Sequence, residues 1–103
     1  MTTKLVWTPS ARSDVKKIYI DIGKSQPLVA ERYFASFRAK AERLVAHPHL
    51  GERHPEIFPS ARMLVEAPYV ILYETVPDTD GGEICSVEIV RVIDGRRDLR
   101  TLF

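Results

Sequence analysis

The sequence predicts a two-layer α+β domain: an N-terminal strand, an antiparallel helix hairpin, and a three-stranded antiparallel meander forming one sheet packed on the helices. Three observations support this fold. Apolar residues recur with a helical period in the first half, the period changes to that of strands after residue 60, and proline or glycine separates the segments. With 103 residues, 45% hydrophobic and 28% charged, the chain has the size and composition of one globular domain. We therefore expect a single domain over residues 1–103.

The first half of the chain predicts a strand followed by two helices. Residues 4–7 have a strand pattern, and Thr8 and Pro9 supply a side-chain cap and a first-turn proline for the first helix. Its apolar face consists of Ala11, Val15, Ile18 and Ile22. A second helix is expected from Pro27 until Pro48 ends it, with the apolar stripe Ala30, Phe34, Phe37, Ala41 and Leu44. Because few residues separate the two helices, we expect an antiparallel hairpin.

The second half predicts a loop and then three strands. Prolines and Gly51 interrupt residues 47–60, which we expect to be a loop. The strands are expected at residues 62–67, 69–76 and 83–93, with turns at Pro68 and in the polar segment 77–82. The helix hairpin has to bury its apolar stripe, and one face of this sheet is the surface available to it.

Charge and composition exclude several classes of protein. Fifteen Lys and Arg against fourteen Asp and Glu give a net charge of +1. Proteins that bind nucleic acid mainly through its phosphate groups usually carry a clear basic excess, so we expect no sequence-specific nucleic-acid binding. Residues 1–50 carry nine basic and four acidic side chains, and residues 51–103 carry six and ten, which hints at two faces with different partners. A single cysteine forms no internal disulfide, and no apolar run suits a signal peptide or a membrane span. We expect a cytoplasmic protein without a membrane partner.

The predicted loop also holds the densest group of potential metal ligands. These are His47, His49, Glu52, His54 and Glu56. Their spacing matches no zinc motif, so a solvated loop is favoured over a metal site. Cys85 is expected to be a buried structural residue, because no His or Lys lies beside it in the sequence to activate a thiol. We expect no metal and no cofactor.

The C-terminal tail combines four arginines with an apolar end. The arginines are Arg91, Arg96, Arg97 and Arg100, and the apolar residues are Leu99, Leu102 and Phe103. Guanidinium groups suit phosphates, carboxylates and stacked bases, but local salt bridges to Asp94 and Asp98 are an equal alternative. The apolar end either folds back on the sheet or docks a partner.

Four blocks of the sequence follow the order found in one known family. They are LVWTPSA at residues 5–11, PLVAER at 27–32, ARMLV at 61–65 with PYVILY at 68–73, and VRVIDGRRD at 90–98. Together they resemble the ParE branch of the RelE/ParE toxin superfamily, the toxins of type II toxin–antitoxin systems. The resemblance implies a strand–helix–helix–three-strand toxin domain, held inactive by a ParD-like antitoxin.

The resemblance implies a target as well. ParE toxins are associated with poisoning DNA gyrase and RelE toxins with cutting messenger RNA on the ribosome, and one fold supports both. Val70 stands where RNA-cleaving relatives commonly have arginine, and Asp94 stands where many ParE sequences have histidine. No acid–base pair for attack by a ribose 2′-hydroxyl is evident. These departures favour a DNA gyrase inhibitor that is not an enzyme.

Two alternatives stay open at this point. One is a RelE-type ribosome-dependent endoribonuclease, in which Arg62, Arg91, Arg96 or Arg97 holds the scissile phosphate. The other is a folded, non-toxic interaction module.

Two sets of site residues follow, and no catalytic residue is assigned. The residues expected to contact the target are Arg62, Arg91, Arg96, Arg97, Leu99, Leu102 and Phe103. Those expected to bind the antitoxin are Tyr19, Ile22, Tyr33, Phe37 and Arg38. The second set is expected near a groove between the hairpin and the sheet, where an amphipathic antitoxin helix folds on binding.

Overall fold

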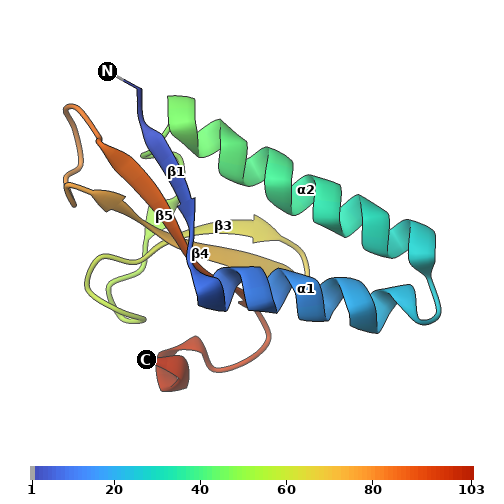
Figure 1. Cartoon of the computed structure of the whole chain (residues 1–103). Helices are drawn as coiled ribbons and strands as arrows, with labels where there is room; N and C mark the ends of the chain where they lie inside the picture. Colours follow the sequence, from blue (N-terminus) through green and yellow to red (C-terminus); the bar gives the residue numbers. More distant parts are fainter. Residues whose placement is uncertain (1) are drawn as a thin grey trace.

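A computed structural model describes residues 2–103 and contains two helices beside one open sheet of five strands (Figure 1). The elements are β1 (Lys4–Trp7), α1 (Pro9–Gly23), α2 (Pro27–Ala46), β2 (Glu52–Arg53), β3 (Arg62–Glu66), β4 (Tyr69–Val76), β5 (Ser86–Asp94) and the short 3-10 helix η1 (Leu99–Leu102). The predicted α+β architecture of N-terminal strand, helix hairpin and strand meander is confirmed.

The sheet joins the two ends of the sequence. Its strand order is β1-β5-β4-β3-β2, and β1 runs parallel to β5 while the other neighbours are antiparallel. The short strand β2 lies inside the segment that was expected to be loop throughout. Strand β5 begins at Ser86, later than expected, and Cys85 just before it is exposed. The prediction that Cys85 is buried is therefore wrong: its backbone bonds to Lys4 and Val76 at the end of the sheet, where its side chain is exposed.

The start of α1 is fastened to the sheet. As predicted, Thr8 caps the helix: its hydroxyl oxygen accepts a hydrogen bond from the Ala11 N–H at 3.2 Å, and Pro9 follows at the first helical position. The same hydroxyl donates to the Ile89 carbonyl at 2.9 Å, and the Thr8 N–H donates to it at 3.1 Å. The first turn of α1 is thereby fixed at the place where β1 ends beside β5.

The main core lies between the helix hairpin and one face of the sheet. Its fully buried members include Ala11, Phe37, Ala41, Leu44, Ile71, Tyr73, Val87 and Ile89. The α2 stripe differs from the prediction at one position: Tyr33 packs against this core, whereas Phe34 is 43% exposed. Figure 1 shows the hairpin reaching past the end of the sheet, so the α1–α2 turn extends beyond the core layer.

A second apolar cluster covers the opposite face of the sheet. Val70 and Leu72 alternate along β4 with the main-core residues, so their side chains lie on the other side. The segment 54–61 and η1 pack over them, and Leu99 and Leu102 are half-buried there. Leu99 and Leu102 thus fold back on the sheet, which is one of the two alternatives for the tail, while Phe103 stays half-exposed.

No helix within residues 2–103 is long and apolar enough to span a membrane.

Candidate functional site

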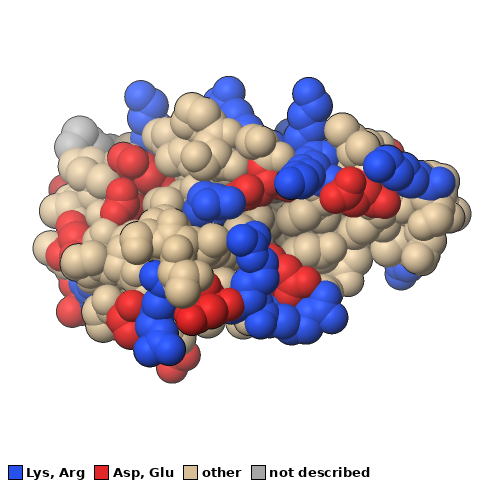
Figure 2. All heavy atoms as spheres, turned by 90° about the horizontal axis from the view of Figure 1, so that it is seen from below, with Lys and Arg blue, Asp and Glu red and all other residues tan. Residues whose placement is uncertain are grey.

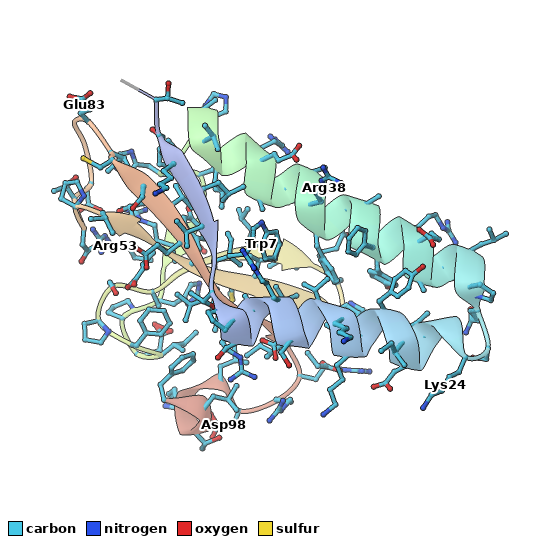
Figure 3. The ribbon with its side chains drawn as sticks, viewed as in Figure 1. Trp7, Lys24, Arg38, Arg53, Glu83 and Asp98 are labelled. Carbon is cyan, nitrogen blue, oxygen red and sulfur yellow. The ribbon has the colours of Figure 1, made fainter. Side chains whose placement is uncertain are left out.

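A groove of about 690 Å³ lies between α1 and α2 at the end of β1. It is lined by Trp7, Arg12, Val15, Lys16, Tyr19, Glu31, Phe34, Phe37, Arg38 and Glu42. Figure 3 labels two of these residues, Trp7 at the helix-facing end of β1 and Arg38 on α2. The groove thus has an apolar interior from three elements and charged residues along both helices.

Two exposed aromatic rings meet across the hairpin inside this groove. Tyr19 of α1 and Phe34 of α2 pack edge to face with their centroids 5.8 Å apart, and they are 37% and 43% exposed. The Tyr19 hydroxyl donates a hydrogen bond to the Glu31 carboxylate, which raises the pKa of Tyr19 because the bond stabilises the neutral phenol. Phe37 lies beneath them with only 1% exposed. Exposed rings held in fixed positions are suited to bury a partner's apolar side chains.

The two helices contribute different charges to the groove. On α1, Arg12 and Lys16 are exposed and form no ion pair with any of residues 2–103. On α2, Arg38 Nε lies 3.3 Å from Glu42 Oε1, and both side chains are largely exposed. The Arg38–Glu42 pair is neutral and Glu31 adds one negative charge on the α2 side, while the α1 side keeps two free cations.

Arg62, expected at the target surface, is 4% exposed and holds two loops together. Its Nη1 donates to the Gly51 carbonyl at 3.1 Å and its Nη2 to Asp80 Oδ1 at 2.9 Å. Tyr73, its register partner in β4, is fully buried and donates its hydroxyl proton to the Pro48 carbonyl at 2.9 Å. These side chains stabilise the segment before β3 and the loop before β5.

Arg91 is likewise engaged inside the molecule. Its Nε and Nη2 donate to the two carboxylate oxygens of Asp14 at 2.6 and 3.0 Å, which raises the pKa of Arg91. The Val92 N–H donates to the same carboxylate at 3.0 Å. Strand β1 pairs with β5 only as far as Ile89. Beyond that point, the Asp14 carboxylate accepts the hydrogen bond of the Val92 N–H at the same edge of β5. This carboxylate therefore joins α1 to β5.

The remaining arginines lie at the turn after β5. Arg96 is exposed, and its backbone N–H and guanidinium donate hydrogen bonds to the Asp94 carboxylate, with Nη2 lying 2.6 Å from Oδ2. These hydrogen bonds lower the pKa of Asp94 to about 2. Arg97 is exposed and has no ion pair within the described residues. The Phe103 ring packs 4.8 Å from Phe58 and stays half-exposed. Figure 2, seen from below, shows acidic and basic side chains interspersed rather than one large area of a single sign.

A family model described as "ParE toxin of type II toxin-antitoxin system, parDE" matches residues 5–99. The chain belongs to the ParE toxin family. A solved structure titled "Chromosomal ParDE TA system from P. aeruginosa" superposes with a TM-score of 0.69 at 20% identity, covering 89% of this chain and 95% of that one. At this identity the likeness shows a shared fold. A comparison with curated proteins finds no match.

In this ParE toxin the groove gathers part of the predicted antitoxin set. Tyr19, Phe37 and Arg38 line it, whereas Ile22 and Tyr33 do not. Tyr33 lies instead against Tyr69, with centroids 5.2 Å apart, and lines a smaller cavity of about 280 Å³ beside α2. The groove was expected between the hairpin and the sheet, and it lies between the two helices at the sheet's edge.

The predicted antitoxin set lacks seven of the residues that line the groove. They are Trp7, Arg12, Val15, Lys16, Glu31, Phe34 and Glu42. Arg12 and Lys16 follow the helical period of Tyr19 on α1, so the same spacing that marked the tyrosine could have found them. Phe34 was assigned to the core stripe, because a spacing of three or four fits both it and Tyr33.

No histidine of the described chain lines the groove, and two of the histidines, His49 and His54, form hydrogen bonds within the loops. His49 Nε2 is 2.9 Å from the Thr79 carbonyl oxygen, and His54 Nδ1 is 3.0 Å from Glu56 Oε2. Across residues 2–103, no group of three or more His, Cys, Asp and Glu side chains is arranged to hold a metal ion.

Proposed function

We propose that this ParE toxin is neutralised by a ParD-like antitoxin whose amphipathic helix occupies the groove between α1 and α2. The observation that carries the proposal is the pair of exposed rings, Tyr19 and Phe34, held side by side in a groove of about 690 Å³. A helix presenting apolar residues at a spacing of three and four would cover these rings and leave its charged side to the rims. The structurally similar protein belongs to a ParDE toxin–antitoxin system, which supports the same kind of partner.

The proposal is tested by truncating the groove and not the core. Phe34→Ala should weaken antitoxin binding by about 2 kcal/mol, because a half-exposed aromatic ring in a docking groove is a typical binding hot spot. The matched control is Leu28→Ala, since Leu28 lies on the same helix, is 80% exposed and does not line the groove. Calorimetric titration with the antitoxin measures both. Equal affinity for the two variants would place the interface elsewhere.

We further propose that the toxin acts on DNA gyrase through protein contacts made by the turn after β5. Membership of the ParE family supports gyrase over the ribosome. Arg96 and Arg97 are the exposed members of the predicted target set at this turn, and Phe103 lies exposed nearby in the sequence. The ribonuclease alternative is weakened, because Arg62 and Arg91 already bind Asp80 and Asp14 and the Tyr73 hydroxyl is buried.

Purified toxin, gyrase, relaxed or supercoiled plasmid and ATP test the target. We expect loss of supercoiling activity and accumulation of cleaved plasmid held by gyrase. Unchanged supercoiling with toxin in excess contradicts the gyrase proposal. In that case, primer extension that finds cuts within translated codons would favour the ribonuclease alternative.

A further inference from the structure

The groove has one positive rim, which carries Arg12 and Lys16, and one rim with a formal charge of −1, which carries Glu31, Arg38 and Glu42. Arg12 and Lys16 line its α1 side, exposed and without an ion pair among residues 2–103. On the α2 side, Glu42 already pairs with Arg38, and Glu31 accepts the Tyr19 hydroxyl bond. An occupant therefore meets two unsatisfied cations along one edge only.

The spacing of the two cations has a geometric meaning. Arg12 and Lys16 are four residues apart, so they lie one above the other about one helical turn apart, on the same side of α1. A helix lying along the groove presents its own side chains with the same rise per turn. Two carboxylates at positions i and i+4 on its edge would reach both cations.

The opposite arrangement is unfavourable. If the occupant turned its acidic edge toward α2, those carboxylates would face Glu31 and Glu42, which are already bound to groups of this chain. Like charges placed opposite each other oppose association and help to exclude wrong partners. The apolar interior sets the position of the occupant, and the charge difference between the rims sets its rotation about its own axis.

We propose that Arg12 and Lys16 determine antitoxin specificity by binding two acidic residues, one helical turn apart, on the edge of the antitoxin helix that faces α1. This inference rests on the groove being the antitoxin site. Arg38, a member of the predicted antitoxin set, already pairs with Glu42, so we assign the ionic contact with the antitoxin to α1 and not to α2.

The chain offers a closely matched pair of variants. Lys16→Glu and Lys17→Glu change neighbouring exposed lysines of one helix and alter the net charge equally, but only Lys16 lines the groove. The probe is the antitoxin encoded by the reading frame adjacent to the toxin gene, titrated against each purified variant at about 50 mM and about 500 mM salt.

At low salt we expect Lys16→Glu to weaken binding roughly five- to twentyfold and Lys17→Glu to change it by less than about twofold. The difference between the variants should shrink at high salt, because exposed ion pairs are screened. Replacing the partner carboxylate by lysine should restore binding to Lys16→Glu and weaken binding to the unaltered toxin. Such rescue distinguishes a direct contact from a structural effect.

Three outcomes would overturn the inference. If Lys16→Glu binds like Lys17→Glu while Phe34→Ala loses affinity, the groove proposal holds and the charge inference is wrong. If all three bind normally, both proposals are wrong. If sedimentation shows that the toxin alone dimerises and Lys16→Glu abolishes the dimer, the groove is a contact between copies of this chain.

Discussion

At the scale of single residues, one carboxylate connects two layers of the fold. Asp14 accepts two hydrogen bonds from Arg91 and one from the Val92 N–H, although it lies 77 and 78 positions away in the sequence. Its side chain is mostly shielded from water. No local sequence signal marks this residue, because its partners become neighbours only when β5 lies beside β1.

Asp14→Ala should therefore be costly to stability. We expect a loss of about 2–3 kcal/mol in the free energy of unfolding, since the change leaves a half-buried guanidinium and a strand-edge N–H without their acceptor. The control is Asp21→Ala, an exposed residue of the same helix whose contact with Lys24 spans 4.0 Å. Urea unfolding followed by circular dichroism measures both, and equal midpoints would show that the Asp14 contacts contribute nothing.

Asp94 gives a pH-dependent prediction at the same scale. Its pKa in the folded chain is lowered from 3.8 to about 2 by hydrogen bonds from Arg96. A lowered folded-state pKa adds stability that is present above pH 3.8 and is lost as the pH falls toward 2. Carboxyl NMR should show the Asp94 titration midpoint near 2, and Arg96→Gln should move it upward. A midpoint that does not move would mean that Arg96 is not the cause.

At the scale of elements, the helices were predictable and one strand pairing was not. Caps, prolines and apolar period are local signals, and they located α1 and α2 closely. The parallel pairing of β1 with β5 depends on contacts across the whole sequence, and β2 is too short to leave a period. The groove could be expected only in outline, because the helical period does not tell which of Tyr33 and Phe34 faces the core.

The two phenylalanines of α2 should separate stability from binding. Phe37→Ala removes a fully buried ring and should cost about 3–5 kcal/mol of folding free energy. Phe34→Ala removes a half-exposed ring and should cost about 1 kcal/mol or less. Phe37→Ala is therefore unsuitable as a binding test, although the residue lines the groove. Thermal unfolding of both variants checks this, and similar losses would mean that Phe34 belongs to the core.

At the scale of the whole molecule, the sheet is covered on both faces. The sequence suggested a single helical layer and left the apolar end of the chain open. In the structure, the segment 54–61 and η1 pack on the face of the sheet opposite the helices and form the second apolar cluster there. Arg96 and Arg97 are exposed between that packing and β5, so the tail has both a structural and an exposed part.

This division predicts different effects along the tail. Leu102→Ala should lower the free energy of unfolding by about 1–2 kcal/mol, because the half-buried side chain packs on the second cluster. Arg97→Ala should leave stability unchanged and reduce gyrase inhibition, if the turn contacts the target. Denaturant titration and the supercoiling assay measure the two properties. A destabilised Arg97→Ala, or one that inhibits gyrase fully, contradicts this division.

The pairing of β1 with β5 also bears on how the protein is made. Strand β1 is synthesised before the other described elements, whereas β5, its neighbour in the sheet formed by residues 2–103, comes after β2, β3 and β4 in the sequence. Trp7 and the cap of α1 are fixed by that neighbour, so the end of the groove cannot form on a partly synthesised chain. If the groove binds the antitoxin as proposed, we expect capture through the complete groove only after β5 has been synthesised, and the turn that we assign to the target directly follows that strand.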